Sequence, residues 1–86
     1  EAERLCRGAL AIFREIGDRR GEAQSMDIIG FIAYDRGNYE EAERLYRKEV
    51  RMKNEMGIPL NDWFIENGYT DPDAEWDFPP PRENSE

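Results

Sequence analysis

The same seven-residue phrase occurs twice in this chain, 40 residues apart. "EAERLCR" begins at Glu1, "EAERLYR" begins at Glu41, and six of the seven letters are identical. The register extends further, since Gly17 in the first copy corresponds to Gly57 in the second. Self-similarity at a fixed period of roughly 20 to 50 residues is typical of repeat architectures, in which each copy buries its apolar face against its neighbour. The chain is therefore expected to fold as stacked copies of one small unit.

Apolar residues recur at steps of three and four over three stretches, which is the spacing of one helix face. The patterns predict helices over Glu1–Ile16, Glu22–Arg36 and Glu40–Met56, with a polar linker before the second. Gly17 and Gly57 suit the left-handed conformation that ends many helices. We expect an all-α fold of three antiparallel helices that bury the following residues: Leu5, Leu10, Phe13, Ile29, Ala33, Leu45, Tyr46 and Val50.

One glycine lies inside the second predicted helix. Gly30 costs that helix about 0.5–1 kcal/mol relative to alanine. A helix tolerates this cost where another helix must approach closely, so we expect Leu45 or Tyr46 to face Gly30.

The chain changes character after Gly57. Residues 58–70 contain Trp63 among other apolar residues and are expected to form a short helix that caps the repeats, with Asn61 as its N-cap. Residues 71–86 are acidic and rich in proline, and are expected to be extended or disordered. Trp76 in this tail is interpreted either as part of a docking motif for another protein or as a solvated end.

The charge is unevenly distributed. Residues 1–56 hold 12 acidic and 11 basic side chains, whereas residues 57–86 hold eight acidic and one basic. Neither part suits a phosphate backbone, so no nucleic-acid partner is expected. No apolar run approaches the roughly 20 residues of a membrane helix, so no membrane partner is expected either. The single cysteine, Cys6, is interpreted as a small core residue of a protein in a reducing compartment, the cytoplasm.

The residues that carry most enzyme chemistry are missing. The chain has no histidine, which removes the commonest general base, most zinc sites and every histidine-dependent triad. It also has no glycine-rich phosphate loop. Glu40 and Glu43 stand four residues before Arg44 and Arg47, which is typical of a solvated helix face. We expect no catalysis, no cofactor and no metal.

The stretch "SMDIIGFIAYDRGNYEEAERLYRKEV" resembles a tetratricopeptide repeat. The family pattern has bulky, aliphatic and small residues on its first helix, then an alanine and an aromatic on its second. The matching residues here are Met26, Ile29, Gly30, Ala42 and Tyr46. The resemblance covers roughly residues 1–57 and departs at Glu49, where the family has a small residue. The period is similar to that of a longer-period branch, common in bacterial regulators and signalling scaffolds.

The resemblance implies a right-handed solenoid of helix pairs that holds a protein or peptide on its concave side. Carried over residue by residue, the binding face consists of Gln24, Asp27, Phe31, Tyr34 and Asp35. Their spacing also places these residues on one helical flank, where the aromatic rings offer contact area and the aspartates favour a basic group. The alternative for Phe31 and Tyr34 is packing against the neighbouring repeat. The lysine and asparagine that one subset uses to grip chaperone C-termini are absent, so that ligand is not expected.

The chain is interpreted as the second half of one repeat followed by a whole repeat, residues 22–56, at the C-terminal end of a longer array. The expected function is protein binding or scaffolding. The alternative is a regulatory or sensor arm of a larger enzyme or transcription regulator. Because the first helix lacks its hairpin partner, one apolar flank is expected to be bare and to support self-association. The residues of that flank are Ala2, Cys6, Ala9 and Phe13.

Overall fold

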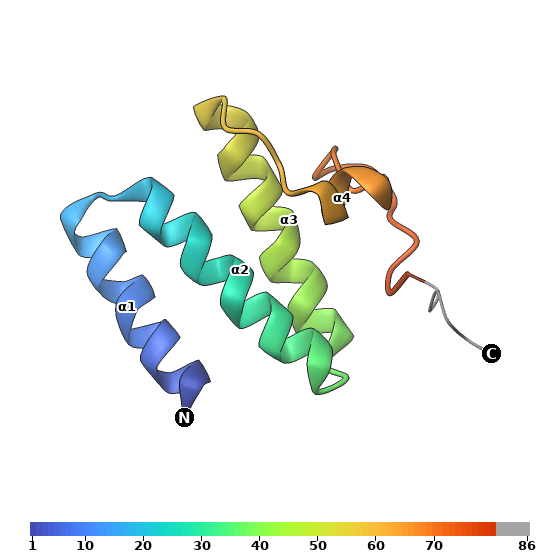
Figure 1. Cartoon of the computed structure of the whole chain (residues 1–86). Coiled ribbons are helices and arrows are strands. Elements are labelled where there is room, and N and C mark those ends of the chain that lie inside the picture. Colours follow the sequence, from blue (N-terminus) through green and yellow to red (C-terminus); the bar gives the residue numbers. More distant parts are fainter. Residues whose placement is uncertain (81–86) are drawn as a thin grey trace.

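The chain forms a row of helices in a computed structural model that describes residues 1–80. Helices α1 (Ala2–Ile16), α2 (Arg19–Asp35) and α3 (Tyr39–Met56) lie side by side in chain order, and the short α4 (Asp62–Glu66) lies beyond α3 (Figure 1). α2 packs against both α1 and α3. All regular structure in residues 1–80 is helical, so the predicted all-α class and its three long helices are confirmed.

The helix ends follow local sequence chemistry. Gly17 and Gly57 adopt left-handed φ angles of 77° and 72°, as predicted. The N–H group of the residue after each glycine then donates to a carbonyl in the last turn, which is a common way to end a helix. α2 begins three residues earlier than predicted, because the Asp18 side chain accepts a hydrogen bond from the Gly21 N–H at 3.1 Å. The expected polar linker is therefore shorter, with Arg19 already helical.

One core cluster lies among the three long helices. Its buried residues are Leu10, Ala23, Met26, Ile29, Leu45 and Met52, with Cys6 packed against them. The close approach of α1 and α2 depends on Gly21, where an added Cβ would lie 2.5 Å from the Phe13 ring. The prediction that Leu5 is buried was wrong, because its flank of α1 faces away from α2 and the side chain is 68% exposed. Phe13 is only half-buried.

The bare flank of α1 also differs from the expected one. Cys6 and Phe13 are half-buried against the rest of the fold, because α2 covers that side of α1. The large exposed side chains of α1 are instead Leu5, Ile12 and Ile16. These three are spaced seven and four residues apart and therefore share one flank.

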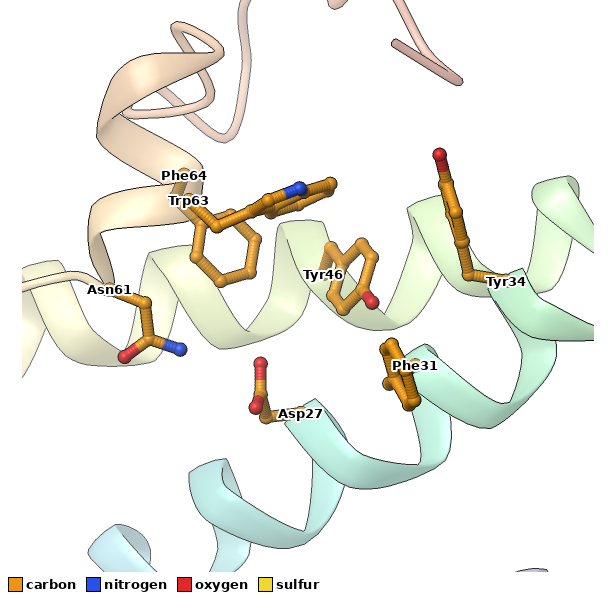
Figure 2. A pocket seen from close by; sticks show the side chains of 7 residues that line it. All are labelled: Asp27, Phe31, Tyr34, Tyr46, Asn61, Trp63 and Phe64. Atoms are coloured by element: carbon orange, nitrogen blue, oxygen red, sulfur yellow. The ribbon is translucent and has the colours of Figure 1, made fainter. Parts of the chain in front are cut away.

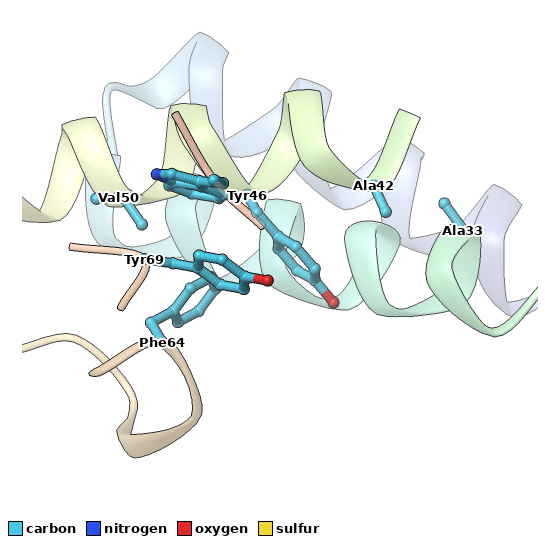
Figure 3. Close-up of a cluster of buried hydrophobic side chains, with 7 residues drawn as sticks. Ala33, Ala42, Tyr46, Val50, Phe64 and Tyr69 are labelled. Carbon is cyan, nitrogen blue, oxygen red and sulfur yellow. The ribbon is translucent and has the colours of Figure 1, made fainter. Parts of the chain in front are cut away.

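A second core cluster joins α3 to the segment that follows it. Its buried residues are Ala33, Ala42, Tyr46, Val50, Phe64, Tyr69 and Trp76. Figure 3 shows Phe64 and Tyr69 turned toward Tyr46 and Val50 of α3. The short helix expected within residues 58–70 is present as α4, with Phe64 as its one buried residue. Tyr69 stacks on Trp76 with ring centroids 4.5 Å apart.

The prediction of disorder was wrong for residues 71–80, and residues 81–86 lie outside the described part of the chain. Trp76 is only 8% exposed, so it is neither a solvated end nor an available docking motif. Its indole N–H donates to the Asp71 carbonyl at 2.8 Å. Arg47 of α3 also contacts residues 72–76. Its guanidinium lies 4.5 Å from the Trp76 ring centroid and donates at 2.8 Å to the carbonyls of both Pro72 and Ala74.

Candidate functional site

The exposed flank of α2 borders two adjoining hollows. Four of the five predicted binding residues line them, and they are Gln24, Asp27, Phe31 and Tyr34. Asp35 lines neither hollow and lies exposed at the end of α2. Most of the predicted face therefore borders the two hollows, and only its last residue, in the C-terminal turn of α2, does not.

The first hollow, here called the aromatic hollow, has a volume of about 300 Å³. Its lining residues come from α2, α3 and the segment around α4, and they are Asp27, Phe31, Tyr34, Tyr46, Asn61, Trp63 and Phe64 (Figure 2). Phe31 is 62% exposed and Trp63 is 36% exposed, whereas Tyr46 and Phe64 are buried behind them. Five aromatic side chains and one carboxylate thus surround a single space.

The aromatic walls support one another through edge-to-face contacts. The Trp63 ring stands at 84° to Tyr34, with centroids 6.2 Å apart, and at 84° to Phe64, with centroids 5.1 Å apart. Tyr46 meets Phe64 at 86° and 5.2 Å. This arrangement places the positive edge of one ring on the negative face of the next, which is the favoured geometry for aromatic pairs. Four of the five aromatic rings that line the hollow are therefore packed against one another, and Phe31 is the exception.

The second hollow, here called the polar hollow, has a volume of about 320 Å³. It is lined by Arg20, Ala23, Gln24, Asp27, Lys53, Ile58 and Asn61. Asp27 and Asn61 line both hollows, so the two form one groove between α2 and the segment 58–64. One half of this groove is aromatic and the other half carries basic and amide groups.

A buried carboxyl group lies on α3 close to this groove. Glu49 is 0% exposed, and Lys53 Nζ lies 3.0 Å from its Oε2. Apart from this ion pair, neither carboxyl oxygen has a hydrogen-bond partner among the described residues. Burial raises the pKa of Glu49 to about 8, and the charge of Asp27 adds to the rise while Lys53 opposes it. The protonated form of Glu49 is therefore favoured more strongly than that of an exposed glutamate.

The tyrosine beside the aromatic hollow is also held neutral. Burial raises the pKa of Tyr46 well above its ordinary value, and the Asp27 carboxylate raises it further. Among residues 1–80, the lining of the groove thus has one acidic side chain, Asp27, and two basic ones, Arg20 and Lys53, which line only the polar hollow.

Several groove residues were not predicted as site residues. Trp63 and Asn61 were expected only as parts of a cap, and Tyr46 only as core. The place of Trp63 and Asn61 beside α2 depends on how residues 58–61 cross α3, which no local pattern encodes. Glu49 did carry a signal, because it stands where the resemblance leads to a small residue.

The described residues show few other candidate sites. Residues 1–80 contain no group of three or more histidine, cysteine, aspartate or glutamate side chains placed to hold a metal ion. None of the helices in this part of the chain has the length and apolar character needed to cross a membrane. A family model described as tetratricopeptide repeat matches residues 1–55, which is more than half of the chain. Comparisons with curated proteins and with solved structures gave no match.

Proposed function

Because this chain belongs to the tetratricopeptide repeat family, we propose that it binds a peptide or protein segment in the groove between α2 and residues 58–64. Repeats of this family generally mediate protein–protein interaction and are typically non-catalytic. The specific proposal is that Gln24, Asp27, Phe31 and Tyr34 contact the ligand, together with Trp63 and Asn61.

The observation that carries this proposal is the exposure of aromatic surface around a preformed hollow. Phe31 and Trp63 are large apolar side chains that remain open to solvent on opposite sides of the aromatic hollow. Exposed apolar surface rimmed by polar groups is typical of interaction sites, and aromatic residues are enriched in them. The neighbouring polar hollow offers amide and charged groups that suit a peptide backbone.

We also propose that the repeat array ends in this chain. In a repeat array each repeat is one helix pair, and it packs against the pair that precedes it. Here α4 and residues 69–80 cover the side of α3 formed by Ala42, Tyr46 and Val50. This cover supports the interpretation of the chain as the C-terminal end of an array, with Phe64 and Trp76 in the place of a following repeat.

A peptide selection tests the proposed function. Random 12-residue peptides are selected on the immobilised 86-residue chain, and the affinity of each enriched peptide is measured by fluorescence polarisation. Phe31→Ala should weaken binding at least about fivefold, because truncating a central aromatic contact commonly costs over about 1 kcal/mol. The matched control is Ile12→Ala, which removes an exposed apolar side chain from α1, outside the groove.

Both variants should unfold at the same urea concentration as the parent chain within error, since neither side chain is buried. Peptides that bind equally well to the parent and to Phe31→Ala, but lose affinity for Ile12→Ala, would place the binding site on α1 and contradict the proposal.

A further inference from the structure

We propose that the aromatic hollow binds the trimethylammonium group of a methylated lysine in the partner peptide. This inference rests on the proposed peptide-binding function and adds the chemistry of one anchor side chain. It is carried by the rings, the carboxylate and the absence of a resident cation in the described lining of the hollow.

The rings are close enough together to act on one cation. A cation is attracted to an aromatic face when it lies within about 6 Å of the ring centroid. The centroid of Trp63 lies 5.4 Å from that of Tyr46 and 6.2 Å from that of Tyr34. Figure 2 shows Trp63 and Tyr34 bordering the same space that Phe31 and Asp27 face from α2. Because five aromatic rings line this one space of about 300 Å³, a group seated in it borders more than one of them.

The charge of the hollow favours a cation. Among the described residues, Asp27 is the only carboxylate that lines it, and this half-buried side chain forms no salt bridge with any of them. Asp27 also lines the polar hollow, together with Arg20 and Lys53, and neither of these basic side chains lines the aromatic hollow. Within residues 1–80, this contrasts with Trp76, whose ring face is already occupied by the Arg47 guanidinium. The aromatic hollow thus offers a carboxylate and several aromatic rings, with no basic side chain among the described residues that line it.

The lining also favours a methylated ammonium over an unmodified one. A lysine ammonium is strongly hydrated and has three N–H donors that need acceptors once it leaves water. The hollow offers the Asp27 carboxylate and the Asn61 amide, and the rest of its lining is aromatic. A trimethylammonium group keeps the positive charge, has no N–H donors to satisfy and presents methyl groups to the rings. Aromatic sites of this kind are used for quaternary ammonium ligands.

The test is an NMR titration of the ¹⁵N-labelled 86-residue chain at constant ionic strength. Three probes are compared: N-acetyl-trimethyllysine methylamide, the same compound without the methyl groups, and a neutral isostere in which carbon replaces the quaternary nitrogen. The trimethyllysine probe should bind at least about fivefold more tightly than either of the others, as expected for a desolvated cation–π contact. The indole N–H signal of Trp63 should shift, and that of Trp76 should stay in place as an internal reference.

A matched pair of variants separates charge from shape. Asp27→Asn removes the carboxylate and should weaken binding of the trimethyllysine probe at least about fivefold while leaving the neutral isostere unaffected. Asp35→Asn removes a carboxylate from the same helix outside the groove, and should change neither.

Three results would overturn the inference: equal binding of the neutral isostere, equal binding of unmodified lysine, or no shift of the Trp63 signal with any probe. The proposed function is tested separately by the peptide selection. Peptides that require Phe31 but bind without any cationic residue would leave that function standing and remove only the methyllysine anchor.

Discussion

Gly30 of α2 lies directly against the ring of Tyr46 in α3. A Cβ atom added at Gly30 would stand 2.8 Å from Cε1 of Tyr46, closer than real Cβ contacts allow. The predicted contact between this glycine and Tyr46 is therefore confirmed. Because Gly30 has no side chain, the Tyr46 ring can lie directly against α2. The same ring lines the aromatic hollow. One glycine thus links the packing of the repeat to the shape of the groove.

The first prediction concerns this contact. Gly30→Leu should lower the free energy of unfolding by more than about 2 kcal/mol, because the new side chain forces Tyr46 out of its place. The control is Gly8→Ala in α1, where an added Cβ meets nothing within 4 Å. That change should instead stabilise the chain by about 0.5–1 kcal/mol through helix propensity. Urea denaturation followed by circular dichroism measures both, and an unchanged Gly30→Leu midpoint would mean that α2 and α3 do not pack in this way.

The second prediction concerns the buried carboxyl of Glu49. The unfolded chain ionises Glu49 near the ordinary glutamate pKa, whereas the folded chain retains the proton up to a pKa of about 8. The folded state therefore binds more protons between these values, and stability should fall as pH rises through this window and level off above it. The slope should reach at most about 1.4 kcal/mol per pH unit.

Glu49→Gln should remove this slope and stabilise the chain at pH 7.5 relative to the parent. The chain has no histidine, so no other side chain type has its ordinary pKa inside the window from pH 5.5 to 7.5. Urea denaturation at four pH values in that window provides the measurement. Glu66→Gln, an exposed change on α4, is the control and should keep the parent slope. A parent stability that is flat or rising over this range would show that Glu49 is ionised in the folded state.

The third prediction concerns the packed tail. Trp76→Ala should lower the free energy of unfolding by roughly 3–5 kcal/mol, because it empties the space between Tyr69 and the Arg47 guanidinium. A cost of about 3 kcal/mol was expected at Trp63 from its proposed capping role. Since Trp63 is 36% exposed, we now expect its replacement to cost less than half as much as that of Trp76. If the Trp76→Ala variant were as stable as the parent, residues 71–80 would not pack against α3, and the disorder predicted from composition would be correct.

The fourth prediction concerns the exposed flank of α1. Leu5, Ile12 and Ile16 should cause the isolated chain to self-associate or to melt at low temperature, because exposed apolar patches recruit partners and few repeats are present. In analytical ultracentrifugation, Ile12→Glu should shift the chain toward monomer. Ala11→Glu, which adds the same charge outside the flank, should not. A monomeric parent chain that melts above about 65 °C would contradict this expectation, since that is the upper end for ordinary domains.

Local sequence determined the repeat itself. The spacing of apolar residues, the two capping glycines and the doubled phrase predicted the three long helices to within a few residues. Such features act over one or two helical turns, so they can be recognised without knowing what lies across the molecule. The common flank of the predicted binding residues could also be recognised locally, because positions three and four apart in a helix share a face wherever that helix packs. Four of the five line the groove.

Tertiary structure decided the second wall of the groove and the fate of the tail. By composition, residues 71–80 lack the aliphatic content to bury themselves, and their acids and prolines predict disorder. They are ordered because Arg47, more than 20 residues earlier, donates to two of their carbonyls and covers the ring of Trp76. Residues 58–61, which lead from α3 to α4, bring Trp63 to the side of the aromatic hollow opposite Phe31. These contacts join segments that are distant in sequence. They can form only when α3 is folded, because Tyr46, Arg47 and Val50 then lie on one surface of the helix.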